Sequence, residues 1–303
     1  MPLEHGELPT REAYEDAVYP EFYDMLIPRL FSDSNTNEDI RLAVNQMNDM
    51  HVKSASDRFA ILDIGTGTGR AALDLVKAMR AEETLHGNIF DILLLEPSAS
   101  MLVEAVAKLA DLSCATSAST DTRAKIGDVQ TFQILAEDLG ETLSDKGLLG
   151  KIDFAMFTAG GLSHITDEQD LRRFLKGTAR CLNADHGRLM LSILNEFISD
   201  QLAEEIETVN TDETVCFRSQ KHPGMSMTKY PTKMQIDPMT GCRTDSFVFE
   251  TKAADGEVEK RILQWTVRMT YLKQWEEMLA ECGLTVEETR QGKIQKYWLL
   301  KRA

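Results

Sequence analysis

The stretch that most constrains the fold of this chain is residues 59–70, which read FAILDIGTGTGR. An apolar run ends in an acid, Asp63, and three glycines at alternate positions then lead into the helix-forming residues ALDLVKAM. Glycine adopts backbone angles that are closed to other residues, and it has no side chain to keep a ligand away from the main chain. The pattern therefore predicts a strand, a tight turn and a helix N-terminus that together form a cradle for a polar cofactor.

The spacing of these glycines separates two classes of cofactor. A dinucleotide fingerprint reads G-x-G-x-x-G, with a ribose-binding acid about 20 residues further on. Here Arg70 stands where the third glycine of that fingerprint would be, and the next strand-ending acid, Glu96, lies farther away. A nicotinamide oxidoreductase is thus an alternative that the spacing disfavours, and calorimetry with both kinds of cofactor distinguishes the two.

Charge and cysteine content exclude other classes of function. With 33 basic and 49 acidic residues among 303, the formal charge is −16, and such a surface repels a phosphate backbone, so we expect no nucleic-acid partner. The five cysteines lack metal-ligand or redox spacing, which predicts reduced thiols in a cytoplasmic protein and no metal. The first residues, MPLEHGELPTREAYED, lack the apolar core of a secretory signal, and no apolar run approaches the length of a membrane span, so we expect no membrane partner.

Strands and helices alternate after the glycine turn. The apolar runs that follow the first strand predict further strands at residues 90–96, 131–139, 152–161 and 188–194, and residues 113–125 are expected to form a loop. This alternation is typical of an α/β fold in which helices cover both faces of a mostly parallel, doubly wound sheet. Ligands of such sheets bind at the carboxyl ends of the strands.

The segments that flank this core have a different pattern. Residues 12–31, in which Pro20 marks a break or a new first turn, and residues 37–50, with Asn35 and Thr36 as possible caps, are predicted helices that form a cover. Residues 213–270 are predicted to form an antiparallel insertion of three or four strands. A helix at 272–282 and two short strands close the chain. We interpret the insertion as a lid or a dimer surface, which leaves a homodimer open. The predicted division is an N-terminal helical cover (1–55), a core (56–197 and 271–303) and a β-rich lid or insertion (198–270).

Four motifs resemble, in the same order, those of class I S-adenosylmethionine-dependent methyltransferases. The first is the D-x-G-x-G-x-G run at Asp63, the second is the strand that ends at Glu96, and the third is the AED turn at 136–138. The fourth, TAGGLSHITD at 158–167, is similar to the loop after strand four in glycine N-methyltransferase and related small-molecule enzymes. The resemblance implies a Rossmann-like seven-stranded sheet whose last strand is antiparallel. It also implies S-adenosyl-L-methionine as methyl donor, with S-adenosyl-L-homocysteine as product.

The resemblance assigns roles to individual residues. It implies that Asp63 and the glycine backbone hold the methionine end of the cofactor, that Glu96 binds both ribose hydroxyls, and that Met101 packs on the adenine. The turn at 136–138 would hold the adenine through Glu137 or Asp138, because Leu135 stands where the family often has an acid. The implied cofactor-binding residues are Tyr23, Asp63, Gly65, Thr66, Gly67, Gly69, Glu96, Pro97, Met101, Ala136, Glu137, Asp138, Thr158 and Ala159.

The same comparison gives candidates for binding the methyl acceptor. Gly160 and Gly161 replace a polar pair of the related enzymes, which is expected to widen the pocket. His164 is the candidate catalytic residue, as a base or as an orienting group for a hydroxyl or ammonium acceptor. A structural histidine that bonds the loop's own backbone is the other interpretation. The candidate substrate-binding residues are Tyr14, Tyr19, Gly160, Gly161, His164 and Trp265.

Taken together, the motifs imply transfer of a methyl group to nitrogen or oxygen of a small molecule by in-line displacement. The loop at 158–167 lacks the D/N-P-P-Y/F run of DNA amino-methyltransferases, so a small metabolite, such as one of specialised metabolism, is the expected acceptor. The alternative is a protein of the same fold that binds the cofactor without methyl transfer, in a regulatory role or for a diverted reaction. It would form no S-adenosylhomocysteine with any acceptor.

Overall fold

The computed structural model describes residues 8–30, 38–53, 56–114, 123–199, 206–209 and 214–303. Contacts between residues divide the chain into two compact units. Unit 1 contains residues 1–32 and 201–269, and unit 2 contains residues 33–200 and 270–303. Each unit is built from segments that are distant in the sequence.

Unit 2 contains a seven-stranded sheet in the order β15-β16-β6-β5-β2-β3-β4. The neighbouring strands from β6 to β4 are parallel, and β16 runs antiparallel to both β15 and β6. This arrangement confirms the predicted doubly wound sheet with an antiparallel last strand. Its strands are β2 (Arg58–Ile64), β3 (Ile89–Leu95), β4 (Lys125–Phe132), β5 (Phe154–Phe157), β6 (Arg188–Leu194), β15 (Leu284–Gln291) and β16 (Gln295–Arg302).

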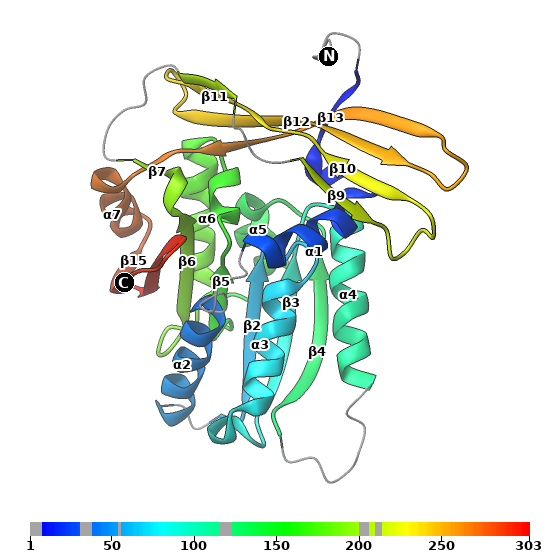
Figure 1. The fold of residues 1–303 in the computed structure, drawn as a ribbon. Coiled ribbons are helices and arrows are strands. Elements are labelled where there is room, and N and C mark those ends of the chain that lie inside the picture. The colour runs from blue at the N-terminus through cyan, green and yellow to red at the C-terminus, as the bar shows by residue number, and fades with distance from the viewer. Residues whose placement is uncertain (1–7, 31–37, 54–55, 115–122, 200–205, 210–213) are drawn as a thin grey trace. The chain divides into compact units, whose positions relative to one another are not determined.

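Helices cover both faces of this sheet (Figure 1). Leu75, Val76 and Met79 recur at helical spacing on α3 and are buried, as are residues of α2 and α4 in the same hydrophobic core. The helix α5 packs against α6. The bounds are α2 (Glu38–Lys53), α3 (Arg70–Ala81), α4 (Ala99–Cys114), α5 (Leu139–Asp145), α6 (Glu168–Cys181) and α7 (Leu272–Glu281), with the short strands β7 (Ile198–Ser199) and β14 (Thr270–Tyr271) paired to each other.

The strand β4 differs from its prediction. It spans Lys125–Phe132, whereas the sequence predicted a strand at 131–139 and a loop at 113–125. The reason is that β4 is an edge strand of the sheet, so most of its residues are exposed, and polar residues interrupt its apolar ones. The helix α4 extends to Cys114, and residues 115–122 lie outside the described residues.

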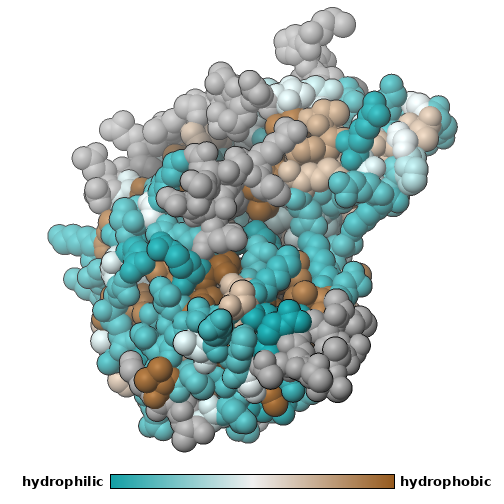
Figure 2. All heavy atoms as spheres, turned by 60° about the horizontal axis from the view of Figure 1, so that its bottom comes forward, coloured by the Kyte–Doolittle hydropathy of each residue, from teal (hydrophilic) through white to brown (hydrophobic). Residues whose placement is uncertain are grey.

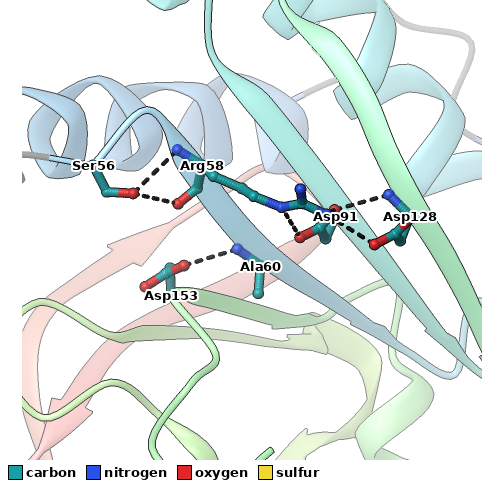
Figure 3. Close-up of polar contacts among 6 residues, drawn as sticks. All are labelled: Ser56, Arg58, Ala60, Asp91, Asp128 and Asp153. Carbon is teal, nitrogen blue, oxygen red and sulfur yellow. Dashed lines mark hydrogen bonds and ion pairs between the residues drawn. The ribbon is translucent and has the colours of Figure 1, made fainter.

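An ion network joins the amino ends of three neighbouring strands (Figure 3). The guanidinium of Arg58 on β2 donates two hydrogen bonds to Asp91 on β3, at 2.7 and 2.8 Å, and one of 2.8 Å to Asp128 on β4. The carboxylate of Asp153 accepts a hydrogen bond of 2.8 Å from the backbone N–H of Ala60. These contacts fix the register of the strands at the end of the sheet opposite to the glycine turn.

Unit 1 contains a second seven-stranded sheet. Its long central hairpin pairs β12 with β13 along eleven residues each, and β1 joins β13 in parallel. The strands β9 and β10 extend the sheet from one half of β12, and β8 and β11 from the other half. The bounds are β1 (Thr10–Glu12), β8 (Ile206–Val209), β9 (Val215–Arg218), β10 (Ser226–Lys229), β11 (Lys233–Asp237), β12 (Cys242–Lys252) and β13 (Val258–Arg268).

The number of strands in the insertion was predicted wrongly. Between residues 214 and 269, all of which the structure describes, the insertion forms five strands, β9 to β13, rather than three or four. The segment MSMTKYPTKMQI, expected as one strand, forms β10 and β11 on either side of Pro231. Proline has no N–H to donate to the ladder, so it separates the two strands.

The N-terminal segment also differs in part from its prediction. A short strand, β1, and a 3-10 turn at Ala13–Glu15 precede the helix α1, which spans Tyr19–Leu30. The carboxylate of Asp16 accepts hydrogen bonds from the backbone N–H groups of Val18 and Tyr19, and α1 begins at Tyr19. Pro20 therefore lies in the first turn of this helix, which is one of its two predicted roles. The predicted caps of the second helix, Asn35 and Thr36, lie outside the described residues.

The predicted helical cover at 1–55 combines two helices that belong to different units. Tyr19 and Phe22 of α1 pack on Phe217, Phe247 and Phe249 of the insertion, whereas α2 packs on α3 of unit 2. The roles of residues 1–55 as a cover and of residues 198–270 as a lid stay predictions.

Where Figure 2 draws described residues, the face is mainly hydrophilic, with smaller apolar areas between the hydrophilic residues. Among the described residues, no helix is both long enough and apolar enough to cross a membrane.

Candidate functional site

Polar residues of unit 2 gather at the carboxyl ends of four parallel strands. Asp63 lies at the end of β2, Glu96 directly follows β3, the turn at Ala136–Asp138 follows β4, and Thr158 follows β5. Since these strands are parallel neighbours in one sheet, their carboxyl ends lie side by side. The structure thus brings together the four motifs that the sequence analysis took from distant parts of the chain.

Asp63 is a buried carboxyl group, with 2% of its surface exposed. It accepts a hydrogen bond of 2.6 Å from the hydroxyl of Thr66 and another from the backbone N–H of Ala72. Burial nevertheless raises the pKa of Asp63 to about 7, because these hydrogen bonds and the nearby Arg70 only partly compensate for the lost water. A ligand cation at this position would restore its charge.

The glycines of the turn satisfy two different requirements. Gly65, Gly67 and Gly69 all have positive φ. A Cβ at Gly69 would lie 2.8 Å from the Cα of Ala105 on α4, so that glycine allows two segments of backbone to approach closely. A Cβ at Gly67 would meet only the sulfur of Met101, at 3.9 Å, so the space beside Gly67 is open to a ligand.

Glu96 holds the glycine turn from the neighbouring strand. One of its carboxylate oxygens accepts a hydrogen bond of 2.9 Å from the N–H of Gly67, and the other accepts one of 2.9 Å from the N–H of Ser98. Burial raises the pKa of Glu96, and these two hydrogen bonds oppose the shift. Met101 is buried nearby, whereas Pro97 is exposed.

Two contacts of the cradle escaped the sequence analysis. The guanidinium of Arg70 donates a hydrogen bond of 2.7 Å to Asp39, a buried acid in the first turn of α2. The ammonium of Lys108 on α4 donates one of 2.9 Å to the carbonyl of Thr68. An acid in a first helical turn and a lysine on a helix are too common for the sequence to reveal such partners.

The turn at Ala136–Asp138 is held by α6. The guanidinium of Arg173 donates a hydrogen bond of 3.1 Å to the carbonyl of Glu137 and one of 3.2 Å to the carboxylate of Asp138. Ala136 is buried, and Leu135 is 51% exposed. The carboxylate of Asp138 therefore has a partner on α6, and the choice between Glu137 and Asp138 as an adenine contact stays a prediction.

The loop after β5 is tightly folded. Ala159 has a φ of 56° and Gly160 a φ of 78°, and a 3-10 turn spans Gly161–His164. A non-glycine residue with positive φ is strained, and such strain is most often found at functional sites. Thr158 and Ser163 are buried. The hydroxyl of Ser163, a residue that the sequence analysis did not select, has no hydrogen-bond partner among the described residues.

The expectation that Gly160 and Gly161 widen a pocket is wrong. A Cβ at Gly160 would lie 3.0 Å from the side chain of Leu194, and a Cβ at Gly161 would lie 2.4 Å from the ring of Phe157. Larger residues of the same unit fill the space that the missing side chains leave. His164 is exposed at the end of the turn, and its part in catalysis stays a prediction.

The remaining candidates lie in unit 1. Tyr14 stacks on Trp265, with ring centroids 6.4 Å apart. It also makes edge-to-face contacts with Tyr19 and Tyr23, with interplanar angles of 74° and 75°. Tyr19 is buried among aromatic rings of its own unit, and this burial raises its pKa. These residues form one aromatic cluster. Their contacts with a cofactor or an acceptor stay predictions.

Among the residues that the structure describes, no group of three or more histidine, cysteine, aspartate or glutamate side chains has a metal-binding arrangement. A surface cavity of about 420 Å³ lies beside α5 and α6, and of the predicted cofactor residues it includes only Glu137. Two of the basic side chains that line it form ion pairs, Arg172 with Glu168 and Glu281, and Arg173 with Asp138 and Asp170.

No family model and no curated protein matches the sequence. Solved structures of similar fold include a S-adenosylmethionine-dependent methyltransferase from Clostridium acetobutylicum, which is 13% identical and has a TM-score of 0.61 over 94% of this chain and 99% of that one. A sugar N-methyltransferase from a Streptoalloteichus species is 14% identical, with a TM-score of 0.56 over 93% of both chains.

A third structure of similar fold is an amino pentose methyltransferase from Micromonospora echinaspora with S-adenosylmethionine bound. It is 14% identical and has a TM-score of 0.53 over 93% of this chain and 97% of that one. At such identities the likeness establishes the fold. The chain has the fold of class I S-adenosylmethionine-dependent methyltransferases.

Proposed function

We propose that the protein is a methyltransferase (EC 2.1.1) that uses S-adenosyl-L-methionine to methylate nitrogen or oxygen of a small molecule. The observation that carries this proposal is a pair of buried carboxylates, Asp63 and Glu96, on either side of a glycine turn with open space at Gly67. Buried carboxylates need hydrogen-bond donors or cations. The ammonium and the ribose hydroxyls of this cofactor provide both.

We propose the following contacts along the cofactor, from its methionine end to its adenine. Asp63 would bind the ammonium, the backbone of Gly65 to Gly69 the methionine chain, Glu96 the ribose hydroxyls and Met101 one side of the adenine. The turn at 136–138 would bind the adenine edge, and Thr158 and Ala159 would lie beside the sulfonium. Thr66 holds Asp63 in position through its hydroxyl, Pro97 follows Glu96, and Tyr23 is the proposed contact of the methionine carboxylate.

When bound, S-adenosylmethionine supplies an electrophilic methyl group. The protein then has to align the acceptor in line with the sulfur and exclude water. His164 would orient the acceptor or remove its proton, and Gly160 and Gly161 would bring the loop backbone close to it. Tyr14, Tyr19 and Trp265 are the proposed acceptor contacts of unit 1.

The class of acceptor is inferred from two relatives of the same fold. One is a sugar N-methyltransferase, and the other is an amino pentose methyltransferase involved in calicheamicin biosynthesis. We therefore propose a metabolite of specialised metabolism as the acceptor. The net charge of −16 supports an acceptor other than nucleic acid.

Calorimetry with S-adenosylhomocysteine, S-adenosylmethionine and NAD tests the cofactor class. We expect binding of the first two and none of NAD. Glu96→Ala should weaken the binding of S-adenosylhomocysteine at least about tenfold, because two hydroxyl donors lose a charged acceptor. Asp111→Asn, which changes an exposed acid on α4, is the matched control and should bind like the wild type.

Tight binding of NAD without any response to S-adenosylmethionine would contradict the proposal. A screen of amines, phenols and amino sugars for an added methyl mass then tests the transfer itself. A protein that binds the cofactor but forms no S-adenosylhomocysteine with any acceptor would be a binding protein of the same fold.

A further inference from the structure

One aromatic ring lies between the two loops to which the proposed function assigns the cofactor and the acceptor. Phe157 is the last residue of β5, is 4% exposed, and packs edge-on against Phe174 of α6, with ring centroids 5.4 Å apart. The glycine turn follows the adjacent strand, β2, and the loop at 158–164 directly follows Phe157 itself. Its ring can therefore touch both loops.

The same atom of this ring occupies the side-chain space of two glycines. A Cβ built at Gly65 would lie 2.6 Å from Cε2 of Phe157, and a Cβ built at Gly161 would lie 2.4 Å from that same Cε2. Cβ atoms in proteins essentially never come closer than 3.0 Å to a heavy atom to which they are not bonded. The φ of Gly161 is outside the left-handed region, so at this position space alone requires glycine.

The ring also has little room to move away. Phe174 closes one side of it, and interiors of proteins are packed too densely to take up a displaced ring without further shifts. At the neighbouring Gly160, Leu194 and Phe197 lie 3.0 and 3.5 Å from the position that a Cβ would take. A displacement of the loop at Gly161 therefore pushes the ring of Phe157 against Gly65.

We propose that Phe157 is a positioning residue that sets the separation between the cofactor cradle and the acceptor loop. This inference rests on the proposed function, since it assumes that the two loops bind the two substrates. Methyl transfer depends on the distance between the reacting atoms, and a misplacement of about 1 Å can slow such a step about a hundredfold. The ring thereby couples the shape of the acceptor loop to the affinity for the cofactor.

The test measures the affinity for S-adenosylhomocysteine by calorimetry, so it needs no known acceptor. Gly161→Ala changes only the acceptor loop, yet it should weaken binding about tenfold by pushing the ring against Gly65. Phe157→Leu removes the ring edge, and the double variant Phe157→Leu/Gly161→Ala should bind within about threefold of Phe157→Leu. Gly160→Ala is the control, because its Cβ meets Leu194 and Phe157→Leu should not relieve its effect.

Unchanged binding by Gly161→Ala, or a loss that Phe157→Leu does not relieve, would overturn the inference. If Gly161→Ala alone does not fold, recovery of a folded double variant supports the same role, and a double variant that is no better folded than the single one counts against it. Failure of the proposed function is distinguishable, because the wild type would then not bind S-adenosylhomocysteine at all.

Discussion

Asp63 is the residue in unit 2 whose environment most directly predicts a pH dependence. Its pKa of about 7 lies above its ordinary value of 3.8 because burial disfavours the charged carboxylate. In the cofactor-free protein, the neutral form therefore predominates below about pH 7. The stability that this group contributes is fully present below its ordinary pKa and is lost as the pH rises through the folded-state pKa.

We predict that the affinity for S-adenosylmethionine rises with pH up to about pH 7 and then levels off. The ammonium of the cofactor pairs with the ionised carboxylate, so below that pH binding must release a proton and weakens up to about tenfold per pH unit. Calorimetry in buffers of different ionisation enthalpy measures this proton release.

Asp63→Asn is the matched variant for this effect. It should bind the cofactor weakly and without this pH dependence. In the wild type, the titration of Asp63 lowers the free energy of unfolding as the pH rises from about 4 to about 7, and the variant should lack this decrease. Wild-type binding that is independent of pH over the same range would show that Asp63 does not meet the ammonium.

At the scale of elements, two glycines allow α5 and α6 to touch through their backbones. A Cβ at Gly177 would lie 2.9 Å from the Cα of Gly140, and one at Gly140 would lie 2.6 Å from the Cα of Gly177. The turn at 136–138, which leads into α5, is held by Arg173 from α6. The close approach of these helices thus also determines where the proposed adenine turn lies.

We predict that Gly177→Ala destabilises the protein, although it lies inside a helix. Helix propensity alone would favour alanine by about 1 kcal/mol. The new methyl group would instead meet backbone that cannot rotate away, and overpacking of this kind costs about 1–3 kcal/mol. Denaturant unfolding measures the difference, and binding of S-adenosylhomocysteine should weaken as well because the turn shifts.

Lys176→Ala is the control for this prediction, since it changes the preceding, exposed position of the same helix. Its stability should stay close to that of the wild type. A Gly177→Ala variant that is more stable than the wild type would mean that the helices separate without cost.

At the scale of the whole molecule, polar contacts join the N-terminal segment to residues that lie 198 to 245 positions further along the chain. The guanidinium of Arg261 on β13 donates hydrogen bonds of 2.5 and 2.9 Å to Asp16, and both side chains are 2% exposed. Glu21 of α1 accepts hydrogen bonds from the hydroxyl of Ser219 and from the backbone N–H groups of Gln220 and Lys221. These contacts explain why residues 1–32 and 201–269 form one unit.

We predict that Asp16→Ala destabilises unit 1 by about 3–5 kcal/mol, because it removes the buried carboxylate that pairs with the guanidinium of Arg261 and leaves it only the more distant Thr251 and the exposed Glu259. The double variant Asp16→Ala/Arg261→Met should recover much of this loss, since no buried charge is left uncompensated. Denaturant unfolding with tryptophan fluorescence measures both, since Trp265 lies in unit 1. A double variant that is as unstable as the single one would show that packing, rather than the charge, causes the loss.

The sequence by itself determined the core of unit 2 and the proposed cofactor cradle. The apolar runs of β2, β3 and β6, the glycines after Asp63 and the acid Glu96 are local signals, because strand burial and turn geometry act over a few residues. The order of these segments along the chain also implied the parallel sheet and a ligand site at the carboxyl ends of its strands.

Tertiary structure alone decided which distant segments meet. The polar edge strand β4 has no apolar run to reveal it, and nothing near Asp16 in the sequence indicates a partner at Arg261. Likewise, Gly160 and Gly161 suggest empty space until the rings and side chains of Phe157 and Leu194 are seen to fill it. The physical reason is that such contacts depend on packing between elements, whereas propensity and periodicity report only on each element's own residues.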